Sequence, residues 1–139
     1  MKPTHYLLGI FAFLLLNACG GTRQGQLPGA TAAKYKVMIL YANGEGKTFD
    51  MDYYEKKHMP MVAGFIGSNL VHYEIDKGIS GRAATDKPTY LAIGYFYIND
   101  VDAYNKSIAQ NREAVMADFK NYTNIQPVIQ ISEVQRVSR

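Results

Sequence analysis

The chain of 139 residues has a single cysteine and no tryptophan, and its charge is almost balanced. One cysteine excludes a disulfide within the chain, so the fold depends on its hydrophobic core alone. With 15 Lys and Arg residues against 12 Asp and Glu, the net charge is only +3, and no long run of like charges occurs. Because nucleic-acid binding needs a concentrated basic stripe, we predict no nucleic-acid partner.

The short motifs that mark several common kinds of site are also missing. The sequence contains no GxGxxG stretch for a dinucleotide and no GxSxG nucleophile elbow. The histidines beyond the N-terminal segment are His58 and His72, and no spacing such as HxxxH joins either to a second ligand. We therefore predict no metal site and no cofactor, and haem ligation by His58 or His72 is the alternative.

An apolar run stands out near the N-terminus, from Tyr6 to Leu16, and follows Lys2. It is shorter than the about 20 apolar residues that span a bilayer, which is typical of a secretory signal. The run ends in LNAC (16–19), which resembles the lipobox of bacterial lipoproteins. That resemblance implies lipidation of Cys19 and attachment to a membrane of the bacterial cell envelope, on its periplasmic or extracytoplasmic side. The alternative is an ordinary secretory signal with an incidental cysteine.

These features divide the chain into three parts. Residues 1–18 are the predicted signal peptide, and residues 19–34, rich in Gly, Thr and Ala without apolar periodicity, are a predicted flexible tether. Residues 35–137 are predicted to form one folded domain, since their length is ordinary for a single hydrophobic core.

Apolar alternation and helical spacing predict the order β-α-β-β-α-β within this domain. Strands are expected at 35–41, 69–78, 89–98 and from about Val128, and the clearest helix is expected over 99–122. The first and third strands are apolar on both faces, as central strands are. Such crossovers give an α+β, ferredoxin-like sandwich, in which the helices cover only one face of the sheet. The other face is expected to pair with a second copy of the chain in a homodimer.

The stretch FDMDYYEKKHMP (49–60) contains one of the few histidines and is expected to form the first helix. Thr48 is its expected cap, and Pro60 is expected to disfavour helical geometry at Met59. A kinked second helical piece is expected after Pro60, with its length limited by Gly64 and Gly67. One helical stripe then contains Met51, Tyr54, His58, Met61 and Phe65. His58 therefore faces inward. It is either a core histidine bonded to a carbonyl freed by Pro60, or a general acid or base.

Two longer stretches, LYANGEGKTFDMDYYEKKHMPMV (40–62) and DFKNYTNIQPVIQISEV (118–134), resemble the EthD family, named for a protein associated with ethyl tert-butyl ether degradation. The resemblance covers 35–137 and implies a dimeric α+β barrel with a pocket between sheet and helices. Members are commonly labelled oxidoreductases, and the wider superfamily includes cofactor-free monooxygenases, cyclases and isomerases. The matching family histidine is His58. The export signal departs from typical members and argues against a nicotinamide-dependent reductase, because NAD(P)H is absent outside the cytoplasm.

The residues and the resemblance together indicate a site for a small hydrophobic or aromatic molecule. His58 is the expected acid or base, with Tyr54 as the second catalytic residue. The expected substrate contacts are Tyr41, Met61, Phe65 and His72. Three functions stay open: an EthD-type oxidoreductase, a non-enzymatic binding protein, and a cofactor-free cyclase or isomerase.

Overall fold

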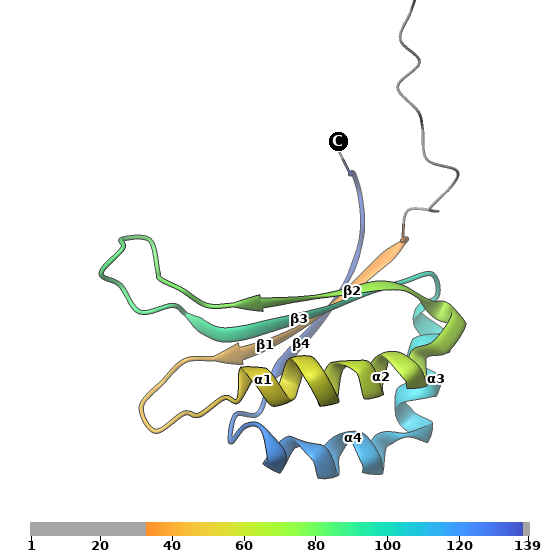
Figure 1. Cartoon of the computed structure of the whole chain (residues 1–139). Helices are drawn as coiled ribbons and strands as arrows, with labels where there is room; N and C mark the ends of the chain where they lie inside the picture. The colour runs from red at the N-terminus through yellow and green to blue at the C-terminus, as the bar shows by residue number, and fades with distance from the viewer. Residues whose placement is uncertain (1–32, 138–139) are drawn as a thin grey trace, which may run out of the picture. The chain divides into compact units, whose positions relative to one another are not determined.

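The computed structural model describes residues 33–137. The predicted signal peptide (1–18), Cys19 and nearly all of the predicted tether lie outside the described residues. In chain order the elements are β1 (Tyr35–Ala42), α1 (Met51–Tyr53), a π-helical turn (Tyr54–His58), α2 (Met59–Ile66), a 3₁₀ turn (Gly67–Asn69), β2 (Leu70–Lys77), β3 (Tyr90–Ile98), α3 (Val101–Gln110), α4 (Arg112–Asp118), a second 3₁₀ turn (Phe119–Asn121) and β4 (Val128–Glu133). The predicted element order and the α+β, ferredoxin-like fold class are confirmed (Figure 1).

The sheet is antiparallel and has the strand order β2-β3-β1-β4, so β1 and β3 are central, as predicted. Along β1, Val37 and Ile39 point toward the helices and are buried. They pair with Phe96 and Gly94 of β3, which lie on the same face. The intervening residues of both strands face the other side. Because successive side chains of a strand point to opposite faces, the apolar residues of these two strands line both sides of the sheet.

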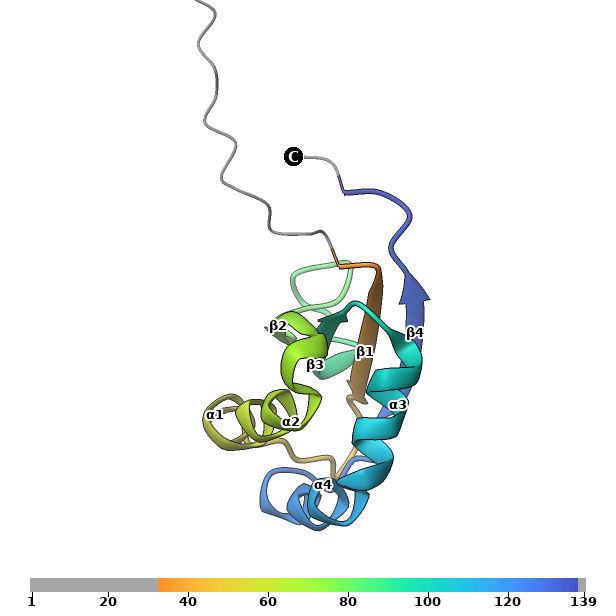
Figure 2. The same cartoon turned by 90° about the vertical axis from the view of Figure 1, so that its right-hand side faces the viewer.

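The helices of residues 33–137 all lie on one side of the sheet (Figure 2). The core between the two layers is rich in aromatic side chains and consists of Val37, Ile39, Tyr41, Tyr54, Met59, Val62, Ile66, Ala92, Phe96, Ile98, Tyr104, Tyr122 and Ile125. Burying a large apolar side chain of this kind contributes roughly 1.5–3 kcal/mol each. None of the helices within residues 33–137 has the length and apolarity to cross a membrane.

The first helical segment differs from the prediction at its start. Asp50, not Thr48, caps it: the Asp50 Oδ1 accepts a hydrogen bond from the Tyr53 N–H at 3.0 Å. The Thr48 N–H instead donates to Oδ1 of Asn124 at 2.9 Å. The prediction was wrong because both Thr and Asp suit a cap, and a partner distant in the sequence holds Thr48.

The predicted loss of helical geometry at Met59 is also wrong, whereas the second helical piece predicted after Pro60 is present as α2 and ends before Gly67. Met59 keeps helical angles of φ −63° and ψ −43°, and its N–H donates to the Tyr54 carbonyl five residues earlier. This π-helical turn places one extra residue in the helix, so the inward stripe moves by one position. After His58 the buried residues are Met59, Val62 and Ile66, rather than the predicted Met61 and Phe65.

The predicted helix over 99–122 is divided into two. It breaks at Asn111, which has φ −109° and ψ 14°, and the Asn111 side-chain amide donates to the Ser107 carbonyl at 2.9 Å. After the break, α4 runs beside α1 and α2, as both ribbon views show. The change of direction brings Asp118, at the end of α4, next to the first helical segment.

Candidate functional site

His58 is a buried histidine with an ionic partner. Its side chain leaves the π-helical turn and its Nδ1 lies 2.8 Å from Oδ2 of Asp118, while its Nε2 lies 3.2 Å from the Tyr122 hydroxyl. The residue is only 4% exposed. The hypothesis that His58 bonds a carbonyl freed by Pro60 is therefore wrong, because both ring nitrogens bond side chains from the second helical segment.

Asp118 is fixed from both sides. Its Oδ2 faces His58, and its Oδ1 accepts hydrogen bonds from the Tyr53 hydroxyl and the Asn121 amide, each at 2.8 Å. Burial acts to raise the pKa of Asp118, but the bonds from His58, Asn121 and Tyr53 outweigh it and lower that pKa below its usual range. The carboxylate is thus ionised at neutral pH.

The hydrogen-bond partners assign the tautomer of His58. Burial lowers the pKa of His58, and Asp118 only partly opposes this, so the imidazole is neutral at pH 7. A carboxylate can only accept, which places the proton on Nδ1. Nε2 then accepts from the Tyr122 hydroxyl. His58 therefore holds a basic lone pair toward Tyr122, and Asp118 is placed to stabilise the imidazolium that proton uptake would form.

A chain of tyrosines continues from His58 into the core. The Tyr122 and Tyr41 hydroxyls lie 2.9 Å apart, and the ring of Tyr54 meets the Tyr41 ring edge-on at 5.4 Å. Burial raises the pKa of Tyr41, Tyr54 and Tyr122, so these hydroxyls stay protonated. Gly94 makes room for this arrangement, because a Cβ at Gly94 would collide with the Tyr54 hydroxyl.

A cavity of about 70 Å³ lies between the sheet and the helices beside this chain. The lining residues with polar side-chain groups are Tyr41, Tyr54, Tyr104 and His58, whereas the other walls are apolar: Ile39, Met59, Val62, Phe96, Ile108, Val115, Phe119, Pro127 and Ile129. Tyr122 is not part of the lining. Among the lining residues, Ile129 on the edge strand β4 is 58% exposed.

The predicted site residues separate into two groups. Tyr41, Tyr54 and His58 come together at the cavity, whereas Met61 and Phe65 do not line it, because the π-helical turn rotates them away. His72 lies on the far face of the sheet, exposed, with its ring stacked on Tyr97 at 4.1 Å. The expected substrate contacts of Met61, Phe65 and His72 are therefore not part of this cavity.

Sequence reasoning missed Asp118 and gave Tyr122 no role in the site. Their spacing of four residues at the end of a helix places side chains on one face, which is a usable signal. It was not decisive, because the direction in which this face points depends on the break at Asn111.

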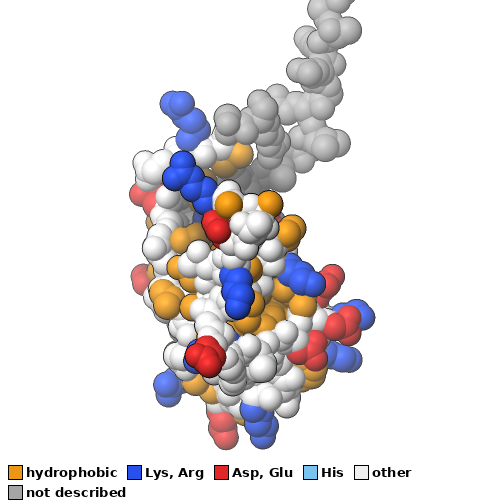
Figure 3. Space-filling view, turned by 90° about the vertical axis from the view of Figure 1, so that its left-hand side faces the viewer, with side chains coloured by type: hydrophobic (Ala, Val, Ile, Leu, Met, Phe, Trp, Pro, Cys, Tyr) orange, Lys and Arg blue, Asp and Glu red, His pale blue; other side chains and the backbone are white. Residues whose placement is uncertain are grey.

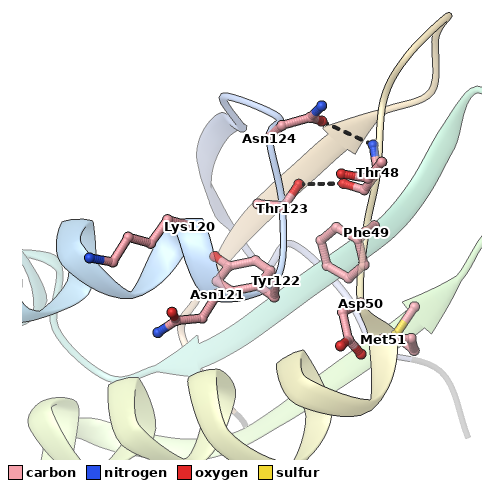
Figure 4. A pocket seen from close by; sticks show the side chains of 9 residues that line it. All are labelled: Thr48, Phe49, Asp50, Met51, Lys120, Asn121, Tyr122, Thr123 and Asn124. Atoms are coloured by element: carbon pink, nitrogen blue, oxygen red, sulfur yellow. Dashed lines mark hydrogen bonds between the residues drawn. The ribbon is translucent and has the colours of Figure 1, made fainter.

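A second, more polar hollow of about 610 Å³ lies between the segments 48–51 and 120–124 (Figure 4). The two segments run side by side, with the Thr123 hydroxyl donating to the Thr48 carbonyl at 2.9 Å and the Asp50 N–H donating to the Tyr122 carbonyl at 2.7 Å. Tyr122 lines this hollow, and its hydroxyl contacts His58. The hydrogen bonds between these two segments thus hold Tyr122 in place.

Within residues 33–137 no group of three His, Cys, Asp or Glu side chains is placed to hold a metal ion. On the surface shown in Figure 3, acidic and basic side chains are interspersed, with apolar side chains exposed between them.

Comparison with known proteins finds similar solved structures, whereas no protein-family model and no curated protein matches the chain. The structure of an EthD-like protein from Ralstonia eutropha is 34% identical, with a TM-score of 0.72 over 78% of this chain and 99% of that one. An EthD family protein from Bacillus halodurans shares the fold at 14% identity, with a TM-score of 0.56 over 73% of this chain and 99% of that one. The identity and the coverage of the first structure show that this chain belongs to the EthD family.

Proposed function

We propose that the protein is an enzyme that binds a small hydrophobic or aromatic molecule in the cavity and transfers a proton to or from it, with His58 as general base and acid. One observation carries this proposal. A buried and neutral histidine, paired with an ionised carboxylate, stands at the wall of an apolar cavity.

The geometry supports proton transfer better than simple capture. An apolar ligand can be bound by apolar walls alone, whereas a buried imidazole with a carboxylate beside it costs desolvation free energy, which hydrogen bonds have to offset. Perturbed ionisable groups beside a cavity are typical of active sites. General acid or base catalysis by a placed side chain contributes about 10²- to 10⁴-fold in rate.

The same proton step suits both enzymatic alternatives. An oxidoreductase-type reaction, which is the common label of the family, and a cofactor-free cyclisation or isomerisation each require a proton to be moved on an organic substrate. In either reaction Asp118 would orient His58, and Tyr41 and Tyr54 would contact the substrate at the cavity wall. The requirement for an added electron donor distinguishes the two reactions.

The working form is proposed to be a homodimer that pairs the uncovered faces of two sheets. In the described part of the chain no layer covers this face, which presents the apolar side chains Met38, Leu40, Ile93, Tyr95 and Val128. Lys36 lies over the Tyr95 ring at 5.5 Å on the same face. An exposed apolar face that includes both central strands favours association with a second copy of the chain.

The lipid anchor on Cys19 is part of the proposal, with the protein held at a membrane of the cell envelope. Cys19→Ser should remove the lipid, so that the protein moves from the membrane fraction to the soluble fraction while the domain stays folded. Mass spectrometry of the mature protein should find an acylated cysteine at its N-terminus. An unmodified cysteine there, or a chain that retains residues 1–18, would contradict the anchor.

The catalytic proposal is tested in two steps. Native mass spectrometry of the protein purified from its own cells identifies any retained small molecule, and turnover of that molecule is then measured. His58→Gln should lower kcat by about 10²- to 10⁴-fold, because the base is lost. Lys57→Gln is the control, since Lys57 is exposed one position before His58 and does not line the cavity, and it should leave kcat unchanged. Full activity of His58→Gln would exclude the base, and saturable binding without product in the unaltered protein would indicate a binding protein.

A further inference from the structure

Tyr104 is a buried tyrosine at the cavity that takes no part in the hydrogen bonds of the site. It lies on α3, is 7% exposed and lines the cavity together with Ile108, one turn further along the same helix. Burial alone raises the pKa of Tyr104 to about 12. Within residues 33–137 no hydrogen bond joins the Tyr104 hydroxyl to another group, whereas the Tyr41 hydroxyl bonds Tyr122 at 2.9 Å. Because buried hydroxyls in native proteins are normally hydrogen-bonded, this exception requires an explanation.

The Tyr104 hydroxyl borders the cavity. Every side-chain nitrogen or oxygen atom that is fully enclosed in the described part of the chain has a hydrogen-bond partner. Because the Tyr104 hydroxyl has none, it is not fully enclosed and must border accessible space. The residue is more than nine-tenths buried and lines the cavity, so the cavity is the space that its hydroxyl borders.

The position of the Tyr104 ring does not depend on its hydroxyl. At the start of α3, Oδ1 of Asp100 accepts a hydrogen bond from the Ala103 N–H at 2.7 Å. Further along the helix, the Ser107 hydroxyl donates to the Phe65 carbonyl near the end of α2. These bonds and the packing of the ring fix Tyr104, so its hydroxyl is left for a ligand.

A phenylalanine at this position would fill the same space without an unpaired hydroxyl. Phe96 and Phe119 line the same cavity with rings of that kind. A hydroxyl that is buried without a partner gives up its hydrogen bond to water and gains none in return. A residue that lowers stability at the wall of a ligand cavity is typical of a functional position.

From this position we infer that Tyr104 binds an oxygen substituent of the ligand, so that the cavity selects molecules with a hydroxyl or carbonyl group over hydrocarbons of the same shape. The inference rests on the proposed function, because it names the substrate class of the same cavity. It needs no particular direction of the hydrogen bond, since a tyrosine hydroxyl can donate to a carbonyl oxygen or accept from an O–H group. The ligand supplies the partner that the folded chain lacks.

The cavity also limits how the rest of such a ligand is accommodated. An apolar cavity of about 150 Å³ can hold benzene, whereas this one measures about 70 Å³. An aromatic ring therefore enters only if a wall side chain moves. Met59 is the wall residue that adapts most easily, because its side chain is unbranched. His58 lines the same cavity from another helical segment, so a ligand bound at Tyr104 lies between the two segments.

The first test asks whether the Tyr104 hydroxyl has a partner in the full-length folded protein. Tyr104→Phe removes only that hydroxyl, so its midpoint of urea unfolding should be unchanged or higher, because no bond is lost. Tyr41→Phe removes a hydroxyl that bonds Tyr122 and should lower the midpoint by about 0.3–1 M. A fall of the same size in Tyr104→Phe would overturn the inference, because the hydroxyl would then be bonded within the protein.

The second test uses phenol and toluene, which have nearly the same shape and differ in the oxygen. Dissociation constants are measured by calorimetry, and shifts of the His58 ring signals in NMR spectra verify binding at the cavity. Each probe is compared between proteins, because phenol and toluene lose different hydration on binding. Tyr104→Phe should weaken the binding of phenol by about 2- to 10-fold, as expected for one net hydrogen bond, and should not weaken that of toluene. Tyr73→Phe is the matched control, since Tyr73 does not line the cavity, and should change neither.

The outcomes separate the two proposals. A loss of affinity for phenol alone in Tyr104→Phe supports the inference. If Tyr104→Phe binds both probes as the unaltered protein does, the inference is overturned, but the cavity is kept as a ligand site. If neither probe shifts the His58 signals in the unaltered protein, the cavity is not the substrate site, and both proposals are wrong.

Discussion

Gly94→Ala is expected to disturb the site through Tyr54 alone. The glycine sits on the central strand β3, and a Cβ at this position would lie well inside contact distance of the Tyr54 hydroxyl oxygen. The next atoms that the Cβ would meet, the Tyr54 Cζ and the Met59 Sδ, are both 3.3 Å away. The clash is therefore almost entirely with one oxygen atom, and it can be removed by a second substitution.

The expected magnitudes follow from this geometry. Overpacking a well-packed core costs about 1–3 kcal/mol, so Gly94→Ala should lower the free energy of unfolding by about 2 kcal/mol. Tyr54→Phe alone loses one hydrogen-bonding group and should cost about 1 kcal/mol. In the double variant the offending oxygen is gone, so the double variant should be no less stable than Gly94→Ala alone. The coupling energy is then about 1–2 kcal/mol in favour of the pair.

Urea unfolding followed by circular dichroism measures all four proteins of this cycle. With a slope of about 1–3 kcal/mol per molar urea for a small domain, a loss of 2 kcal/mol moves the midpoint by about 1 M. Gly64→Ala is the matched control, because its Cβ would meet nothing and lies in an exposed helical position. That variant should gain about 0.5–1 kcal/mol. Strict additivity of Gly94→Ala and Tyr54→Phe would refute the contact between the two residues.

Two further predictions concern acidity and assembly. Burial lowers the pKa of His58 in the folded protein, whereas a histidine in the unfolded chain has a pKa of about 6.5. As pH falls below about 6.5, the unfolded chain therefore takes up a proton that folded His58 does not. The free energy of unfolding should then fall by at most about 1.4 kcal/mol per pH unit. The lowered pKa of Asp118 adds a further loss only below its ordinary value of 3.8. Urea midpoints between pH 8 and 5 should therefore vary less in His58→Gln, and identical profiles would contradict the buried neutral form. For the dimer, Leu40→Asp on the uncovered sheet face should give the mass of a monomer by light scattering. Ile79→Asp is the control, because Ile79 is 89% exposed, and it should leave the protein dimeric. A dimeric Leu40→Asp protein would exclude this face as the dimer interface.

Much of the fold was predictable because strand alternation is a local property. A strand places successive side chains on opposite faces, so the two stretches with apolar side chains on both faces were predicted to be central. The sheet order confirms this for β1 and β3. The resemblance that identified the EthD family rested on long stretches around His58 and Asp118, and the 34% identity to a solved member bears it out.

The errors all arise where one local pattern permits two structures. Helical spacing after His58 assumed 3.6 residues per turn, and a single π-helical turn moved Met61 and Phe65 off the inward stripe. The break at Asn111 has the same character, because Asn is tolerated both within a helix and at its end. Neither choice is visible in the apolar pattern.

By itself, the amino-acid sequence determined the order of the elements, the central strands, and the presence of Tyr54 and His58 on the buried side of the first helical segment. These are consequences of side-chain periodicity, which needs only neighbouring residues. Only the tertiary structure decided that Asp118 pairs with His58, a contact between residues 60 positions apart. This contact depends on both the π-helical turn and the helix break at Asn111. The turn sets the direction of the His58 side chain, and the break sets the direction of the helix that ends at Asp118.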